Sequence, residues 1–366
     1  MHDRDLPTPA LTIDLDVLEG NIDKMANYCK CHGLGLRPHT KTHKIPQVAR
    51  MQVDHGAIGL TVAKTGEAQV MAAAGLDDIL IAFPVFGYQT VCKLARLAAG
   101  HRELISLDDV ATAQALSQSL RKQEKNATLD VLVEFDAGFG RCGLPPGPAV
   151  VDLARKIEKM PRLRFRGLMT FFGNVWGAEE NRKKDIKTVA ERVETVVELF
   201  QKAKIPVEIV SGGSTPSATL GHEVPGLTEI RPGTYVFNDL NTLYQGACGL
   251  GDCAARVLTT VVSTAVSGRA IIDAGSKALS SDPLTAGTRT GYGYVVEAPD
   301  AELFALSEEH GHLDVTKSSR QFRVGDVLTV IPNHVCPCVN LHEEVFLLQE
   351  GEVVGSWPVA ARGKIR

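Results

Sequence analysis

The sequence lacks the features that mark several classes of protein. Its 366 residues are 44% hydrophobic and 22% charged, which is ordinary for a globular protein and excludes disordered and collagen-like chains. Lysine and arginine number 39 and aspartate and glutamate 43, without a basic block, so no nucleic-acid partner is expected. No run approaches the roughly 18–20 apolar residues of a membrane span. No apolar signal region follows the N-terminus, which predicts a cytoplasmic protein with no membrane partner.

Cysteine is also scarce, with eight in the chain. Without a signal peptide these residues are expected to be thiols or metal ligands rather than disulfides. Six are scattered and are interpreted as small buried hydrophobic residues: Cys29, Cys31, Cys92, Cys142, Cys248 and Cys253. Cys336 and Cys338 differ from these because they stand beside His334.

The first two thirds of the chain repeat one pattern, in which a short apolar run precedes a stretch of helical composition. The apolar runs lie at 34–41, 57–63, 79–83, 103–107, 129–136, 164–172, 207–211 and 229–237. Among the intervening stretches, Glu179–Lys204 places its apolar residues at the spacing of one helix face. Eight strand–helix units predict an α/β fold, a (β/α)8 TIM-type barrel over residues 16–250.

After about Cys253 the segments become short, β-rich and separated by Gly, Pro or Asp. This pattern predicts a small, mostly antiparallel β domain over residues 251–366. A strand expected at Pro9–Leu15 could pair with either domain, and residues 1–15 are assigned to the β domain. The active site of such a barrel is expected at the C-terminal ends of its strands.

The first candidate site is Arg37–Lys44, where two histidines and two lysines follow the first strand. The segment is either a polar loop or the site of a Schiff-base lysine, whose amine must lose its proton and is helped by cationic neighbours. Lys41 is favoured because it ends a barrel strand. Lys44 is expected to begin the next helix, and Lys277, in the β domain, to serve either the seam or a surface pair.

The second candidate is the pair of loops that follow the seventh and eighth strands. Small residues let backbone N–H groups converge on an anion, and barrels often hold phosphate at these two loops. The alternative is an ordinary turn. The candidate phosphate ligands are Gly213, Ser214, Thr215, Gly233 and Thr234.

The third candidate is Asp136–Gly143, whose glycines permit close approach of a ligand and whose Arg141 offers a fixed positive charge. The alternative is a surface arginine in a glycine-rich loop.

The fourth candidate is His334–Cys338 in the β domain. In a strand, His334 and Cys336 would face the same side and could hold one metal ion, and imidazole with thiolate suits zinc. Two protein ligands point to a catalytic rather than a structural metal, and the alternative is an ordinary strand. Cys338 is expected to be a spectator, with a role as third ligand as the alternative. Ser307–His312 is a further ligand source, a support for the ligands or a solvated loop.

Taken together, these motifs resemble the fold-type III pyridoxal-phosphate enzymes. The resemblance covers Pro7 to about Pro358 and is greatest to the D-serine dehydratase, D-threo-3-hydroxyaspartate dehydratase and D-threonine aldolase group. It implies an alanine racemase-like fold, pyridoxal 5'-phosphate, a divalent metal (zinc, or else manganese) and a homodimer.

The resemblance also implies roles for matching residues. Lys41 matches the lysine that binds the cofactor covalently, and Arg141 an arginine near the cofactor's ring hydroxyl. The two glycine-containing loops match the phosphate cup, and His334 and Cys336 the metal pair beside the substrate's β-hydroxyl. Phe171 departs from relatives that place Tyr or His beside the cofactor, and it is expected to stack on the ring.

The function implied is a lyase for small D-amino acids with a β-hydroxyl, namely D-serine, D-threonine or D-threo-3-hydroxyaspartate. The His-x-Cys spacing at Cys336 favours a dehydratase that gives a 2-oxo acid and ammonia. The alternative is a D-threonine aldolase that gives glycine and an aldehyde. A racemase would leave His334 and Cys336 idle, and a non-catalytic cofactor carrier would have no β domain.

Overall fold

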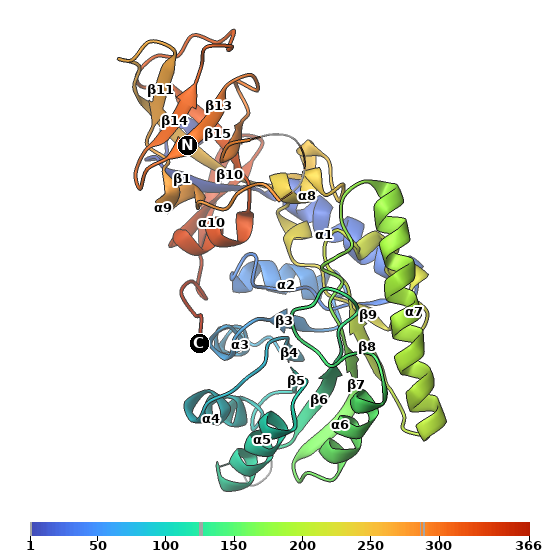
Figure 1. Ribbon diagram of the computed structural model, residues 1–366. Helices are drawn as coiled ribbons and strands as arrows, with labels where there is room; N and C mark the ends of the chain where they lie inside the picture. The colour runs from blue at the N-terminus through green and yellow to red at the C-terminus, as the bar shows by residue number, and fades with distance from the viewer. Residues whose placement is uncertain (1, 124–126, 286, 288–289) are drawn as a thin grey trace. The chain divides into compact units, whose positions relative to one another are not determined.

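A computed structural model of the chain describes residues 2–123, 127–285, 287 and 290–366 (Figure 1). The chain divides into two compact units. The barrel unit comprises Lys24–Lys41, Val48–Gly233 and Lys364–Arg366, and the β unit comprises Met1–Asp23, Thr42–Gln47 and Thr234–Gly363. The chain therefore passes from the barrel unit to the β unit directly after Lys41 and directly after Gly233.

Parallel strands form the centre of the barrel unit. In chain order they are β2 (Gly35–Leu36), β3 (Leu60–Val62), β4 (Ile79–Ile81), β5 (Glu103–Leu107), β6 (Leu129–Glu134), β7 (Leu163–Met169), β8 (Ile209–Gly212) and β9 (Glu229–Ile230). Their order in the sheet is β2-β9-β8-β7-β6-β5-β4-β3. The segment after β2 closes the ring, because His39 bridges Thr61 in parallel and the Thr40 N–H donates to the Thr61 carbonyl at 2.8 Å. The predicted (β/α)8 barrel is confirmed.

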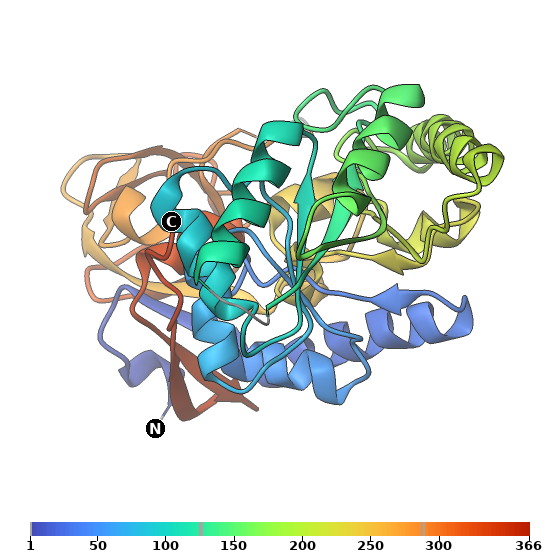
Figure 2. The same cartoon turned by 90° about the horizontal axis from the view of Figure 1, so that it is seen from below.

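Helices lie outside these strands, as the teal and green helices of the two views show (Figure 1 and Figure 2). The helices are α1 (Leu15–Cys31), α2 (Pro46–Asp54), α3 (Thr65–Ala73), α4 (Tyr88–Leu97), α5 (Val110–Gln123), α6 (Pro148–Glu158) and α7 (Glu179–Ala203). On α7 the predicted apolar face is buried, and its Phe200 stacks on Phe165 of β7 with ring centroids 5.4 Å apart. None of the described helices is long and apolar enough to cross a membrane.

The β unit is built on one largely antiparallel sheet. Its strands are β1 (Ala10–Asp14), β10 (Ala255–Ser263), β11 (Arg269–Ile272), β12 (Gly293–Val295), β13 (Glu302–Leu306), β14 (Gly311–Asp314), β15 (Val327–Pro332), β16 (Glu344–Gln349) and β17 (Glu352–Pro358). The N-terminal strand β1 joins this sheet, antiparallel to β10 and parallel to β16. The other described pairs are antiparallel, so the mostly antiparallel domain is confirmed.

Short helices complete the β unit: α8 (Leu240–Tyr244), α9 (Ser276–Leu279) and α10 (Val335–Leu341). The segment after β15 was predicted to be a strand, and that prediction is wrong. The extended chain ends at Pro332, His334 is the N-cap of α10, and Cys336 and Cys338 lie inside this helix. Pro337 is tolerated there because the first turn of a helix needs no N–H donor.

Candidate active site

Lys41 lies in the turn that follows the first barrel strand. Its side chain is half-buried, and its backbone N–H donates to Nδ1 of His39 at 3.3 Å. Lys44 does not begin a helix as predicted, because its backbone is left-handed (φ 56°) and α2 begins only at Pro46. The Lys44 ammonium is buried and lies 3.5 Å from the Ala361 carbonyl oxygen. Lys41 is thus the better placed of the two lysines for chemistry at the strand ends.

Two more lysines bear on this choice. Lys277 is exposed and pairs with Glu309, Nζ to Oε1 2.6 Å, so the predicted surface pair is confirmed. Lys64 follows β3 and its Nζ lies 3.2 Å from the centre of the Phe83 ring. Partial burial lowers the pKa of Lys64. The sequence reasoning missed Lys64, although it follows an apolar strand as Lys41 does.

The loop after β8 is shaped by two glycines. A side chain at Gly212 would come within 2.6 Å of the Phe172 ring, and Gly213 has a φ of 91° that other residues rarely adopt. Backbone can therefore approach a ligand closely at this point, as a phosphate cup requires.

Hydrogen bonds bring the two predicted phosphate loops together. The Gly233 N–H donates to Oγ1 of Thr215 at 3.2 Å. The Ser214 N–H donates to Oγ of Ser217 at 2.9 Å, and the Ser214 hydroxyl lies 3.0 Å from the same oxygen. The barrel unit thus gathers Gly213, Ser214, Thr215 and Gly233 at the ends of β8 and β9.

If this loop is the phosphate cup, Ser214→Ala and Thr215→Ala should each weaken cofactor binding by about 1.5–3 kcal/mol, because each would remove one hydrogen bond to a charged phosphate. Titration of the chain with pyridoxal phosphate, followed by absorbance, measures the affinity. Ser117→Ala is the matched control, since the Ser117 hydroxyl donates to the Pro161 carbonyl. An unchanged affinity in the double variant would place the phosphate elsewhere.

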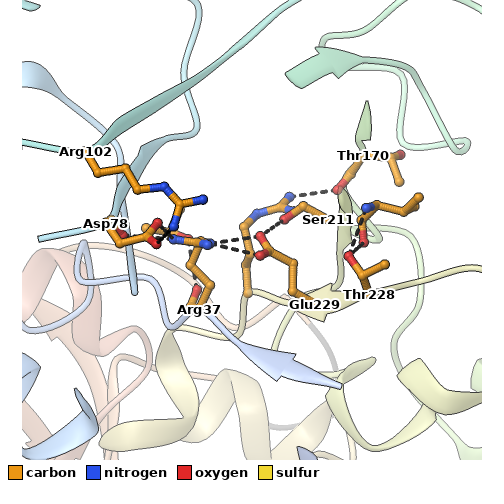
Figure 3. A network of polar contacts seen from close by, with 10 residues as sticks. Arg37, Asp78, Arg102, Thr170, Ser211, Thr228 and Glu229 are labelled. Carbon is orange, nitrogen blue, oxygen red and sulfur yellow. Dashed lines mark hydrogen bonds and ion pairs between the residues drawn. The ribbon is translucent and has the colours of Figure 1, made fainter. Parts of the chain in front are cut away.

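A buried network of charged and polar side chains links the barrel strands that precede these loops (Figure 3). Glu229 accepts from Nε of Arg37 at 2.9 Å and from the Ser211 hydroxyl at 2.6 Å. Arg231 donates to the Ser211 hydroxyl at 2.6 Å and to the Thr170 carbonyl at 2.7 Å. Complete burial lowers the pKa of Arg231 to about 10. The network ties the ends of β2, β7, β8 and β9, and the sequence reasoning did not find it.

Glu229→Gln should destabilise the fold by about 3–5 kcal/mol, because it leaves buried arginines without their counter-charge. Urea unfolding of the full chain measures this free energy. The matched control is Asp78→Asn, since Asp78 also pairs with Arg37 (2.7 Å) but is 20% exposed. An equal loss of unfolding free energy in the two variants would contradict the inference that the buried Arg37–Glu229 pair contributes more than the Arg37–Asp78 pair.

Two carboxyl groups of the barrel are held largely away from water. Burial, with the nearby charges of Asp77 and Asp78, raises the pKa of Glu103 to about 8. Both carboxyl oxygens of Glu103 are buried without a hydrogen-bond partner among the described residues. Burial also raises the pKa of Glu134 to about 7, although the charge of Arg231 opposes the shift.

The loop after β6 presents Arg141 against two aromatic rings. Oδ1 of Asp136 accepts the N–H groups of Gly138 and Phe139, each at 2.9 Å, and so fixes the loop. The Arg141 guanidinium lies 4.4 Å from the centre of the Phe171 ring and 5.5 Å from that of Phe139. The two rings meet edge to face at 5.1 Å. Arg141 is thus a held cation, and Phe171 supplies a ring face rather than a polar group.

His334 and Cys336 lie together at the start of α10. Burial opposes a positive charge on His334, but its hydrogen bond to Cys336 and the charge of Asp239 outweigh this and raise the pKa of His334 to about 9. Nδ1 of His334 lies 2.6 Å from Oδ2 of Asp282. The second ring nitrogen is therefore the one that would serve a metal ion, with the carboxylate fixing the tautomer.

Two threonine hydroxyls surround the Cys336 thiol. The thiol donates to Oγ1 of Thr42 at 3.3 Å, and Oγ1 of Thr234 lies 3.9 Å away. Thr42 follows Lys41 in the chain, and Thr234 follows Gly233. Thr234 was assigned to the phosphate cup, and its side chain contacts the thiol.

The donor set of His334 and Cys336 fits a catalytic metal ion. Imidazole and thiolate are zinc ligands, and no third His, Cys, Asp or Glu completes a cluster anywhere in the described ranges. The Cys338 thiol is buried in the same helix and donates to the Ala278 carbonyl at 3.1 Å. Residues 307–310 form the turn between β13 and β14, and His312 lies in β14 with its Nε2 3.2 Å from Oγ of Ser307. Open coordination positions are what a substrate-binding metal needs.

The barrel residues also fit a bound polar cofactor. The side-chain oxygens Oγ1 of Thr40, Oγ1 of Thr170 and Oδ1 of Asn174 are buried without a hydrogen-bond partner among the described residues. All three follow the C-terminal ends of barrel strands, and buried polar atoms normally have partners. Together with the glycine cradle at Gly212 and Gly213, they match the polar surroundings that pyridoxal phosphate requires.

The profile of the alanine racemase N-terminal domain matches residues 13–240. The chain belongs to this family. A second profile, described as "Putative serine dehydratase domain", matches residues 254–348 of this alanine racemase-family chain.

Named relatives and solved structures show which enzymes the chain is similar to. The chain is 32% identical to 3-hydroxy-D-aspartate aldolase of Paracoccus denitrificans (strain Pd 1222), over 100% of this chain and 94% of the relative. Among solved structures, D-threonine aldolase from Filomicrobium marinum has a TM-score of 0.93 and 31% identity, covering 100% and 97% of the two chains. D-threo-3-hydroxyaspartate dehydratase from Delftia sp. HT23 has a TM-score of 0.90 and 31% identity, covering 98% of each.

These findings confirm the expected group and fold for this alanine racemase-family chain. The relatives are aldolases and dehydratases, which are lyases, so the enzyme class read from the motifs is confirmed as well. A cysteine-to-alanine variant of a dehydratase of the same name has been solved in a metal-free form. Alanine racemases themselves share the fold at 14% identity and a TM-score of 0.72.

Proposed function

We propose that the chain is a pyridoxal-phosphate- and divalent-metal-dependent lyase for D-amino acids that carry a β-hydroxyl group. Its reaction is the dehydration and deamination of D-serine, D-threonine or D-threo-3-hydroxyaspartate to a 2-oxo acid and ammonia. The observation that carries the proposal is the hydrogen-bonded pair of His334 and Cys336, with Asp282 on the imidazole. A racemase has no use for such a pair.

The domains divide the work in this proposal. Residues 16–250 bind pyridoxal phosphate, and residues 1–15 and 251–366 carry the metal ligands. When bound, the cofactor supplies an electron sink for bond breaking at the α-carbon and the metal a Lewis acid for the hydroxyl oxygen. Zinc suits the His334–Cys336 donor set, with manganese as the alternative.

The side chains then have separate tasks. The ε-amine of Lys41 would hold the cofactor and would serve as the base that takes the α-proton of the substrate. Gly213, Ser214, Thr215, Gly233 and Thr234 hold the phosphate. Arg141 donates toward the ring hydroxyl, and Phe171 stacks on the ring. His334 and Cys336 hold the metal ion. By the same resemblance we infer a homodimer, which sedimentation equilibrium tests.

The alternative function is retro-aldol cleavage to glycine and an aldehyde, and relatives named aldolases favour it. The same residues would serve both reactions, which differ in the bond at the α-carbon that is broken. Cys336 favours dehydration, because the dehydratases of this group carry His-x-Cys.

Product analysis with D-threonine distinguishes the two. We expect 2-oxobutanoate and ammonia from the loaded enzyme, and no turnover of L-threonine. Glycine and acetaldehyde would identify an aldolase instead. Appearance of L-allo-threonine alone, the product of inversion at the α-carbon, would identify a racemase. No product from any D-β-hydroxy amino acid would contradict the lyase proposal.

A further inference from the structure

Asp239 is a fully buried carboxyl group that caps two helices of the β unit. Its Oδ1 accepts the Thr242 N–H at 2.8 Å and the Thr242 hydroxyl at 3.1 Å. These bonds cap the N-terminus of α8. Its Oδ2 accepts the Val335 N–H at 2.9 Å, which is the first N–H of α10. No part of Asp239 is accessible to water. One side chain thus fixes the starts of both helices.

The second of these helices carries the proposed metal pair. The residue at the N-cap ordinarily uses its own side chain to accept a free N–H of the first turn. His334 occupies the N-cap of α10 but makes no such bond, and its ring is turned to Asp282 instead. Asp239, which is 96 residues away in sequence, accepts the Val335 N–H in place of the His334 side chain. This leaves the His334 imidazole available for another ligand.

Burying a carboxyl group is unfavourable unless hydrogen-bond donors surround it. The donors here are the N–H groups of Val335 and Thr242 and the Thr242 hydroxyl. These bonds hold the side chain of Asp239 in one position, and through it the starts of α8 and α10.

We propose that Asp239 is a positioning residue for the metal pair: it fixes the first turn of α10, so that His334 and Cys336 are held ready for one cation. This inference rests on the proposed function, because it takes His334 and Cys336 as the metal ligands. Asp239 is not itself proposed as a ligand.

The test is the affinity of the full chain for Co²⁺, whose absorbance reports thiolate coordination. Asp239→Asn keeps the shape of the side chain, but its amide nitrogen cannot accept the Val335 N–H. We expect the Co²⁺ affinity to fall about 10–100-fold, the usual cost of losing a group that orients a metal ligand. The absorbance of bound pyridoxal phosphate should not change, since Asp239 has no proposed role in holding it.

Two further variants separate positioning from a general loss of structure. Thr242→Val weakens the cap of α8 but leaves the Asp239–Val335 bond, so the Co²⁺ affinity should stay within about 2-fold of the wild type. Val335→Pro removes the donor from the other side, at the first helical position where proline is favoured. It should lower the affinity as Asp239→Asn does, and it keeps the test decisive if Asp239→Asn does not fold.

The outcomes of these experiments distinguish the positioning role of Asp239 from the proposed lyase function. If the wild type binds Co²⁺ through Cys336 but Asp239→Asn and Val335→Pro bind it equally well, the positioning role is overturned and the proposed function stands. A loss in Thr242→Val equal to that in Asp239→Asn also overturns it, because α8 alone would then matter. If the wild type does not bind Co²⁺ through Cys336, both proposals fail.

Discussion

Lys41→Ala is expected to yield a chain without covalently attached cofactor and with activity reduced by at least about 10²–10⁴-fold, the usual contribution of a proton-transferring side chain. The reason is that, in the proposed function, this one amine both holds the cofactor and moves the α-proton. Borohydride reduction of the loaded wild-type enzyme, followed by peptide mapping, locates the attachment directly.

The matched control is Lys64→Ala. Lys64 also follows a barrel strand, but its ammonium lies over the Phe83 ring, so its removal should leave the pyridoxyl label in place. A label recovered on Lys64, Lys44 or Lys277 would show that the wrong lysine has been chosen.

The second large effect is expected at the metal pair. Cys336→Ala should abolish tight metal binding and with it the lyase activity, while the absorbance of bound cofactor persists. The ligand must be a thiolate to bind, and alanine offers no donor. Elemental analysis of the purified variant, together with its activity after metal addition, measures both consequences.

Cys338→Ala is the control for this experiment. It removes a thiol from the same helix, one bonded to the Ala278 carbonyl, and should leave metal content unchanged. Cys336→Asp should keep a metal site but shift its preference from zinc toward manganese or magnesium, because carboxylate is a harder ligand than thiolate. Full activity of a metal-free Cys336→Ala enzyme would remove the metal from the mechanism.

The barrel could be predicted from sequence because its signal is local and repeated. Each apolar run is followed by a helix-forming stretch, and the stripe on Glu179–Ala203 is buried as its spacing predicts. The strands β13 and β14 were not predicted, since Glu302–Leu306 and Gly311–Asp314 alternate exposed and buried residues over only a few positions. Their pairing comes from the sheet around them.

The start of α10 shows what local sequence cannot supply. Its seven residues include the β-branched Val335 and Val339, which favour a strand when read alone. The helix is capped by Asp239, which is distant in sequence. The residues near His334 therefore do not predict that a helix begins there. The motif at Thr234 likewise identified a loop but did not indicate that the hydroxyl lies beside Cys336.

The carboxyl groups of Glu103 and Glu134 make the folded chain retain protons that the unfolded chain has already lost. Their pKa values of about 8 and about 7 lie above the ordinary 4.5. Between those limits the native state binds more protons, so the contribution of these groups to stability falls as pH rises. Melting temperatures recorded across this range should therefore decline toward alkaline pH, and less steeply in Glu103→Gln. In practice, the chain should be purified in mildly acidic buffer, where these two groups favour the folded state most.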